Sequence, residues 1–240
     1  MRAKITIFAG LNSNGMKRIA YMLVMALMMA GCNQASKDGD NKEISTNNME
    51  TTKNTRPIFD ILTTYGTMRV QLYDKTPQHR DNFVKLVSEK YYDGMRFHRV
   101  IEGFMIQAGD PFSRDVDKMN KWGTGGPNYT VPAEFVSEYT HKKGALAAAR
   151  KGDLANPKKA SSGSQFYIVH DEYACAPLDG EYTVFGEVIE GLDVIDAIAT
   201  TATDRYDRPY DDVIITAIVP FDESETEEET TAPADTTKVE

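Results

Sequence analysis

The chain has 240 residues, of which 41% are hydrophobic, and it carries 27 basic against 36 acidic residues for a formal net charge of −9. This length accommodates one or two domains, and the hydrophobic share is sufficient for a folded core. The acidic balance excludes a nucleic-acid partner, because such proteins present a basic face to the phosphates and no run of Lys and Arg interleaved with aromatic residues is found here.

The first part of the chain has the pattern of a secretion signal. Residues 16–18 are Met-Lys-Arg, residues 19–30 are an unbroken apolar run, and small residues precede Cys32. The run is shorter than the roughly 20 apolar residues of a membrane span, and it fits the apolar part of a signal peptide. Small residues directly before a cysteine resemble a bacterial lipoprotein signal, in which that cysteine is acylated and becomes the new N-terminus. Met29 stands where such signals usually carry Leu, and an ordinary signal peptide cut nearby is the alternative.

These features predict four segments. A signal peptide is expected at residues 1–31, with translation starting at Met16 because residues 1–15 form a second, unusual leader. Residues 32–56 contain almost no large apolar side chains, so they cannot offset the entropy of ordering and are expected to form a flexible tether after a lipidated Cys32. The folded domain is expected at 57–220, and the Glu- and Thr-rich residues 221–240 are expected to be a disordered tail. With Cys32 lipidated, Cys175 stays unpaired.

The folded part alternates β-rich runs with two helices. A Tyr65-Gly66 hairpin joins the first two runs. Widely separated helices among antiparallel runs over roughly 160 residues favour one closed barrel over repeated βαβ units. Strands are expected at residues 58–63, 67–73, 97–110 with a bend near Glu102 and Gly103, 144–150, 161–169, 182–188 and 213–219. The first helix is expected to have Thr76 as N-cap and Pro77 as its first residue, with Phe83, Leu86, Val87 and Tyr91 buried; the second, over 191–200, is expected to bury Leu192, Ile195 and Ile198.

Residues 97–110 read Phe-His-Arg-Val-Ile-Glu-Gly-Phe-Met-Ile-Gln-Ala-Gly-Asp, which is polar in two places where a plain core strand would not be. Because strand side chains alternate between two faces, Phe97 is expected to share a face with Arg99, and Met105 with Gln107. A permanent cation and an amide beside apolar side chains suit a shallow apolar pocket with one charged edge. The alternative is an edge strand whose Arg99 points into water.

Other chemistries lack their residues. The serines around Gly163 do not form Gly-x-Ser-x-Gly, and the glycine-rich residues 123–127 lack the Gly-Lys-Ser/Thr of a phosphate loop. The four histidines show no paired ligand spacing, so neither a metal nor another cofactor is expected.

By alternation, His98 points away from Arg99 and is expected to be a core histidine. By alternation too, Gln165 and Tyr167 share one face of their strand, and Phe166 and Ile168 take the other.

Residues 97–101 and 104–110 resemble the signature of the cyclophilin family of peptidyl-prolyl cis–trans isomerases. Residues 162–168 and 178–186 are similar to two further blocks of that family in the same order, and the resemblance extends over residues 58–219. It implies a mainly β fold, a closed eight-stranded antiparallel β-barrel capped by two α-helices, with the active groove on the outside of the barrel.

The chemistry of the reaction suits such a groove. An X–Pro bond rotates over a barrier of about 20 kcal/mol because twisting removes the amide resonance. The twisted prolyl nitrogen is pyramidal and regains a lone pair, so a fixed donor that favours this state accelerates rotation without a nucleophile or a metal. A guanidinium is suited to this role because it stays charged and holds its donors in a rigid fork.

The resemblance also implies roles for individual residues. Arg99 would be the main catalytic residue and would donate toward the prolyl nitrogen, and Gln107 would bind the substrate backbone and help to hold Arg99. Pro177 replaces the large aromatic residue that many members carry before Leu178, so weak cyclosporin binding is expected. The substrate-binding residues would be Phe104, Met105, Tyr167 and Leu178 around the proline ring, with Ala149, Arg150, Gln165 and Tyr182 along the groove.

These observations together predict a monomeric isomerase that a lipid anchor holds in the cell envelope, facing the periplasm or the exterior. Its partners would be proline-containing segments of unfolded or partly folded exported proteins, and the membrane through the anchor. A groove that binds peptides without turnover, as a holdase or adaptor, is the main alternative, and a surface adhesin is a third.

Overall fold

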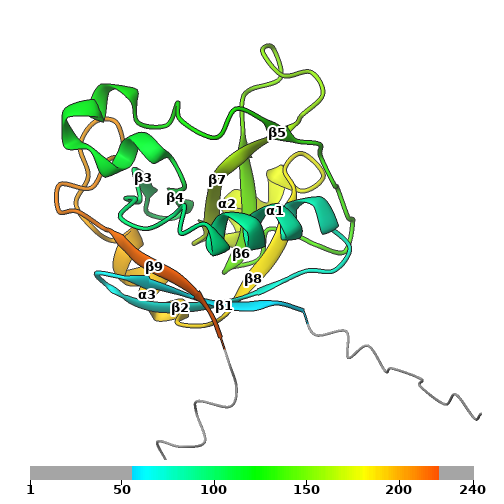
Figure 1. Cartoon of the computed structure of the whole chain (residues 1–240), viewed down its shortest axis with the longest axis horizontal. Coiled ribbons are helices and arrows are strands. Elements are labelled where there is room, and N and C mark those ends of the chain that lie inside the picture. Colours follow the sequence, from blue (N-terminus) through cyan, green and yellow to red (C-terminus); the bar gives the residue numbers. More distant parts are fainter. Residues whose placement is uncertain (1–55, 222–240) are drawn as a thin grey trace, which may run out of the picture. The chain divides into compact units, whose positions relative to one another are not determined.

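The computed structural model describes residues 56–221. The predicted leader, the tether after Cys32 and the acidic tail lie outside the described residues, apart from Arg56 and Phe221 at their inner ends. The described elements, in chain order in Figure 1, are β1 (Ile58–Thr63), β2 (Gly66–Leu72), α1 (Pro77–Ser88), β3 (Arg99–Ile101), β4 (Met105–Ala108), η1 (Pro111–Arg114), η2 (Val116–Lys121), β5 (Thr130–Val131), β6 (Ala145–Arg150), β7 (Ser161–Val169), α2 (Glu172–Cys175), η3 (Ala176–Leu178), β8 (Val184–Glu190), α3 (Leu192–Ala199) and β9 (Ile215–Pro220).

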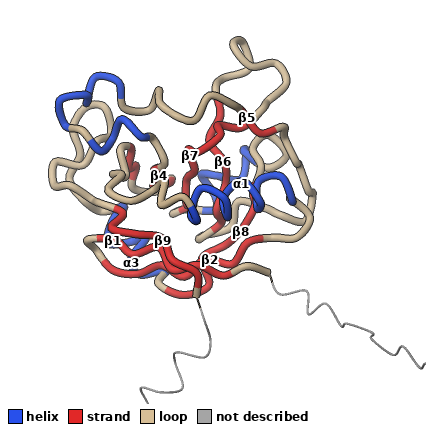
Figure 2. The backbone as a smooth tube through the Cα atoms, viewed as in Figure 1, coloured by secondary structure: helices blue, strands red, loops and turns tan. Residues whose placement is uncertain are grey.

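The strands form one antiparallel sheet in the order β3-β4-β7-β6-β8-β2-β1-β9, with β5 paired to β7 beside this path. The sheet curls into a half-barrel surrounded by long loops (Figure 2). The prediction of an eight-stranded, mainly β antiparallel fold is confirmed, but the prediction of a closed barrel is wrong. Between the end strands β3 and β9 there is no ladder among the described residues, only an isolated bridge of Arg96 with Ile214 and a few backbone hydrogen bonds such as Gly94 N to Ile215 O at 2.8 Å.

The sheet stays open because β3 is only three residues long and the chain before it is irregular. This irregularity also corrects the predicted alternation at the start of the strand. Phe97 lies before β3 and is 1% exposed in the main core, whereas the side chain of Arg99 is 42% exposed on the other face. The two residues therefore do not share a face. The two predicted helices correspond to α1 and α3, and α2 is an additional single turn.

Helix α1 begins with Pro77 as predicted, but its N-terminus is capped from a distance. Thr76 occupies the N-cap position, yet its hydroxyl makes no cap hydrogen bond, so the predicted capping is wrong. Glu134 takes over this role: its carboxylate accepts from the backbone N–H of Gln78 at 3.1 Å and of His79 at 3.0 Å. A carboxylate here satisfies unpaired N–H groups and complements the positive end of the helix dipole.

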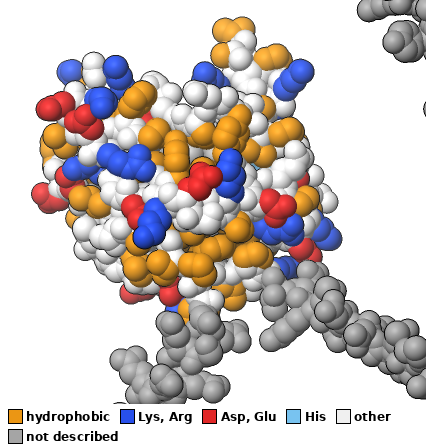
Figure 3. Space-filling model, viewed as in Figure 1, with side chains coloured by type: hydrophobic (Ala, Val, Ile, Leu, Met, Phe, Trp, Pro, Cys, Tyr) orange, Lys and Arg blue, Asp and Glu red, His pale blue; other side chains and the backbone are white. Residues whose placement is uncertain are grey.

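The charged side chains are mixed over the surface. In Figure 3, Lys and Arg side chains alternate with Asp and Glu side chains on the described part of the visible face. This face therefore has no continuous basic surface of the kind that nucleic acids bind.

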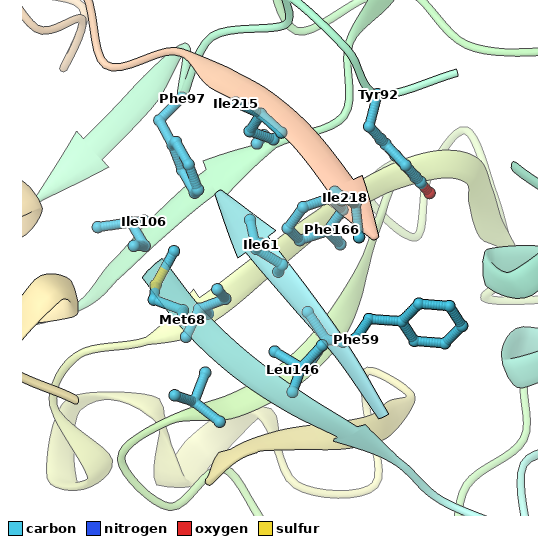
Figure 4. Close-up of a cluster of buried hydrophobic side chains, with 14 of the residues drawn as sticks. Phe59, Ile61, Met68, Tyr92, Phe97, Ile106, Leu146, Phe166, Ile215 and Ile218 are labelled. Carbon is cyan, nitrogen blue, oxygen red and sulfur yellow. The ribbon is translucent and has the colours of Figure 1, made fainter. Parts of the chain in front are cut away.

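The main core joins side chains of the strands to side chains of α1 and α3, and Figure 4 shows part of this cluster. Phe83 of α1 packs edge-on against Phe59 and Phe166, with ring centroids 5.9 Å apart in both pairs. Burying one such side chain contributes about 1.5–3 kcal/mol. The prediction for α3 is partly wrong, because Ile195 and Ile198 are buried while Leu192 is 40% exposed. Other core residues include Ile61, Met68, Leu72, Ile106, Leu146, Ile168, Ile215 and Ile218.

Candidate active site

A second apolar cluster lies on the opposite face of the sheet and contains Met105, Ala147 and Tyr167. A pocket of about 120 Å³ opens beside it. A pocket of this volume is large enough for one small ring. Nine predicted residues line the pocket: Arg99, Phe104, Met105, Gln107, Ala149, Arg150, Tyr167, Leu178 and Tyr182.

Strand register explains why these residues meet. Strand β4 pairs with β3 on one side and β7 on the other, so Arg99 lies opposite Gln107 and Gln107 lies opposite Tyr167. Strand β6 continues this row with Ala147 opposite Tyr167. Directly paired residues point to the same face of a sheet. A cation, an amide and an aromatic ring from three strands thus stand in one row, and the small side chain of Ala147 leaves space next to the ring.

Gln165 lies beside this pocket rather than in it. Its side-chain oxygen accepts from Gln107 Nε2 at 3.0 Å, and its own Nε2 donates to the carbonyl oxygens of Gly123 at 3.2 Å and Gly125 at 2.7 Å. The side chain is 7% exposed, so these bonds also satisfy a buried amide. Gln165 therefore orients Gln107 and lines the neighbouring hollow formed by residues 123–130.

Arg99 has a partner that the sequence analysis did not find. Its Nε lies 3.5 Å from Oδ2 of Asp207, and both side chains are a little under half exposed. The structure records no hydrogen bond between Gln107 and Arg99 within residues 56–221, so the expected contact between these two residues is not seen there. No local pattern could have singled out Asp207, because it lies in a loop far along the chain among alternating acidic and basic residues.

The floor of the pocket is held by a buried hydrogen-bonded chain. Nε2 of His141 lies 2.8 Å from the hydroxyl of Tyr167, and Nδ1 lies 2.6 Å from Oδ1 of Asp179. Burial lowers the pKa of His141 despite the nearby carboxylate, and burial raises the pKa of Tyr167. A neutral imidazole that donates to Asp179 and accepts from the tyrosine hydroxyl satisfies every group in the chain.

Arg150 is a structural clamp at the rim. Its guanidinium is 5% exposed, lies 4.4 Å from the ring centre of Tyr182, and donates from Nε to the carbonyl oxygen of Glu181 at 2.9 Å. Ion pairs with Asp153 and Glu181 neutralise its charge. Arg150 therefore forms a wall of the pocket and ties down the loop over residues 151–160, which projects from the body in Figure 1. Of the two pocket cations, Arg99 is the one that remains accessible.

The described residues contain neither a cluster of metal ligands nor a membrane-spanning helix. No group of three or more His, Cys, Asp and Glu residues between positions 56 and 221 is arranged to hold a metal ion. In the same part of the chain, no helix has the length and apolar character needed to cross a membrane.

Cys175 is buried, and its thiol lies 3.3 Å from the carbonyl oxygen of Phe104.

Comparison with known proteins identifies the family. The profile described as "Cyclophilin type peptidyl-prolyl cis-trans isomerase/CLD" matches residues 58–219. Peptidyl-prolyl cis-trans isomerase B of Streptomyces anulatus is 42% identical over 135 residues, which cover 55% of this chain and 69% of that protein. A cyclophilin-type isomerase of Cryptosporidium parvum has a similar structure, with a TM-score of 0.62 and 30% identity over 70% of this chain and 99% of the other. The chain therefore belongs to the cyclophilin-type peptidyl-prolyl cis–trans isomerases.

Some relatives are much larger. A peptidyl-prolyl cis-trans isomerase of Arabidopsis thaliana is 38% identical over 160 residues, which cover 66% of this chain but 24% of that protein. The chain spans 28% of a similar protein of Rhizopus delemar. The similarity to these two proteins thus concerns one domain of each.

Proposed function

We propose that the chain accelerates rotation about X–Pro bonds by electrostatic stabilisation of the twisted amide, with Arg99 as the donor. The observation that carries this proposal is the accessible guanidinium of Arg99 at the edge of an apolar pocket large enough for one small ring. In the planar amide the nitrogen lone pair is delocalised, and in the twisted state it is localised on nitrogen. A fixed cationic donor therefore stabilises the twisted state more than either planar state, which lowers the barrier.

The other pocket residues bind and orient the substrate. Phe104, Met105, Tyr167 and Leu178 offer apolar walls for the proline ring, so that the ring stays fixed while the preceding carbonyl group turns. Gln107, oriented by its bond to Gln165, is placed to bind the substrate backbone. Fixing one end of the bond in this way lowers the entropy that must be lost to reach the twisted state. Ala149, Arg150 and Tyr182 form the wall along which the rest of the peptide lies.

The test is the isomerisation of a proline-containing peptide by the full chain, purified in detergent, in comparison with the Arg99→Ala variant. Loss of one preorganised donor is expected to lower kcat/KM by about 100- to 1,000-fold. Arg80→Ala is the matched control, because Arg80 lies on α1 and pairs with the exposed Asp81. If Arg99→Ala were as active as the wild type, the mechanism would be wrong. If the wild type bound the peptide but gave the rate of buffer, the alternative of a holdase or adaptor would be correct.

We further propose that the isomerase is exported and held at the cell envelope by a lipid on Cys32, where it acts on exported chains as a monomer. The support is the sequence of the leader, in which an apolar run ends in small residues before that cysteine, followed by a polar tether up to residue 56. Mass spectrometry of the mature N-terminus is the test. We expect an acylated Cys32 and a product in the membrane fraction; an unmodified N-terminus nearby would indicate an ordinary signal peptide.

The proposed ligands are proline-containing segments of unfolded or partly folded proteins. The similar Cryptosporidium parvum isomerase was solved in the presence of the dipeptide Ala-Pro, with 29% identity to this chain and a TM-score of 0.61. The small pocket suits one proline residue, with Ala149 and Arg150 of β6 at its side. The test is a titration with two peptides that differ only at the proline residue. Replacing Pro by Ala in the peptide is expected to abolish binding.

A further inference from the structure

We propose that Asp207 is a positioning residue for Arg99: its carboxylate holds the Nε edge of the guanidinium and leaves the terminal nitrogens for the substrate. The inference rests on the proposed function, in which Arg99 is the catalytic donor. The recorded contact is made by Nε of Arg99, at 3.5 Å from Oδ2 of Asp207. This contact is an ion pair, and within residues 56–221 the structure records no side-chain hydrogen bond from any nitrogen of Arg99.

The position of Asp207 is fixed by its backbone. Its carbonyl oxygen accepts from the backbone N–H of Val100 at 2.8 Å, so it is pinned to β3 one residue after Arg99. The loop is closed on itself by Asp204, whose Oδ1 accepts from the backbone N–H of Tyr206 at 2.7 Å and of Arg208 at 3.0 Å. Such a side-chain-to-backbone turn holds its shape without help from the Asp207 side chain. The carboxylate is therefore delivered to Arg99 by a preformed loop.

The pair is too exposed to be explained by stability alone. The side chains are 42% and 44% exposed, and ion pairs of this kind contribute little to folding. Their effect on a catalytic group is different. An arginine side chain has several rotatable bonds, and an unpaired one at a pocket edge samples several rotamers. A carboxylate at Nε selects one of them before the substrate arrives, so less ordering is needed in the transition state.

The backbone conformation of Asp207 allows a clean test. Its φ is 62°, in the left-handed region that Gly and Asn adopt most readily. Asp207→Asn and Asp207→Gly therefore both preserve the loop, but only Asn retains a side-chain oxygen at the position that faces Nε. Asp211→Asn is the charge control. Asp211 is exposed on the same loop, and its replacement by Asn removes the same charge.

The experiment measures kcat and KM of the full chain, purified in detergent, on a chromogenic proline peptide. Asp207→Gly is expected to lower kcat about fivefold with KM unchanged. Asp207→Asn is expected to keep most of the activity, and Asp211→Asn all of it. Slow hydrogen exchange at the amide of Val100 in each variant would show that the loop remains in place.

A double-mutant cycle separates positioning from a general effect of the loop. In the Arg99→Ala background, Asp207→Gly is expected to have no further effect, because a positioning residue acts only through Arg99. The ¹⁵N NMR signal of Arg99 Nε–H is expected to broaden in Asp207→Gly and to stay sharp in Asp207→Asn. The proposal is overturned if Asp207→Gly is as active as the wild type, or if it lowers activity by the same factor in both backgrounds. Wild-type activity in Arg99→Ala would instead overturn the proposed function itself.

Discussion

Replacing Tyr167 by Phe removes one oxygen atom beneath the pocket that Arg99 and Gln107 line, and leaves the ring in place. The hydroxyl is the partner of His141 Nε2 at 2.8 Å, and the side chain of His141 is 0% exposed. Without the hydroxyl, a buried nitrogen acceptor has no partner, which costs about 1–3 kcal/mol. For a domain of this size, about 1 kcal/mol lowers Tm by about 2–4 °C, so we expect Tyr167→Phe to lower Tm by about 2–12 °C.

The measurements are thermal unfolding for Tm, urea unfolding for the free energy, and the isomerase assay. Because the aromatic wall is unchanged, kcat/KM of Tyr167→Phe is expected to stay within about twofold of the wild type, so stability and activity separate. Tyr182→Phe is the matched control: its ring lies on the same pocket, and the structure records no hydrogen bond of its hydroxyl within residues 56–221. The control is expected to change stability by less than about 0.5 kcal/mol. Equal stability of the two variants would refute the reasoning.

Three further predictions follow from other contacts. Burial lowers the pKa of His98 to about 4, so the unfolded chain takes up a proton first as the pH falls. The free energy of unfolding should therefore fall by up to about 1.4 kcal/mol per pH unit between about pH 6.5 and 4. In His98→Leu the urea midpoint should depend less steeply on pH over that range. An unchanged pH dependence would contradict the assignment. Glu134→Ala removes the remote cap of α1 and is expected to cost about 1–2 kcal/mol in urea unfolding, whereas a loss below about 0.3 kcal/mol would mean that water replaces the carboxylate. Pro177→Trp places beside Leu178 the kind of aromatic residue that many members of the family carry. Cyclosporin binding, measured by calorimetry, is expected to tighten at least tenfold, which corresponds to about 1.4 kcal/mol of binding free energy. Nanomolar binding by the unmodified chain would show that the aromatic residue is not needed.

Much of the site could be predicted because its residues lie in short segments with local rules. The alternation along β7 puts Phe166 and Ile168 in the core and Tyr167 on the pocket face, as expected from a period of two. Pro77 begins α1 because its fixed φ suits the first turn of a helix. The same alternation failed at Phe97, because the strand begins only at Arg99 and the rule holds only within a strand.

Contacts between distant segments could not be predicted in this way. Capping of α1 by Glu134, the bond between Tyr167 and His141, and the pairing of Arg99 with Asp207 each depend on loops whose course no local pattern describes. The open sheet is a further example, because it depends on the length of β3 and on the irregular chain before it. Each of these features requires the register of several strands to be known first.

The sequence by itself determined the family, the order of the strands along the chain and the identity of the pocket residues. The family and the pocket residues follow from the resemblance of short motifs, and the strands follow from side-chain periodicity. Both signals depend on neighbours a few positions apart. Only the tertiary structure decided which groups contact Arg99 and the floor of the pocket. Those contacts join loops to strands across the fold, and their geometry exists only after the sheet has paired and the loops have been pinned to it.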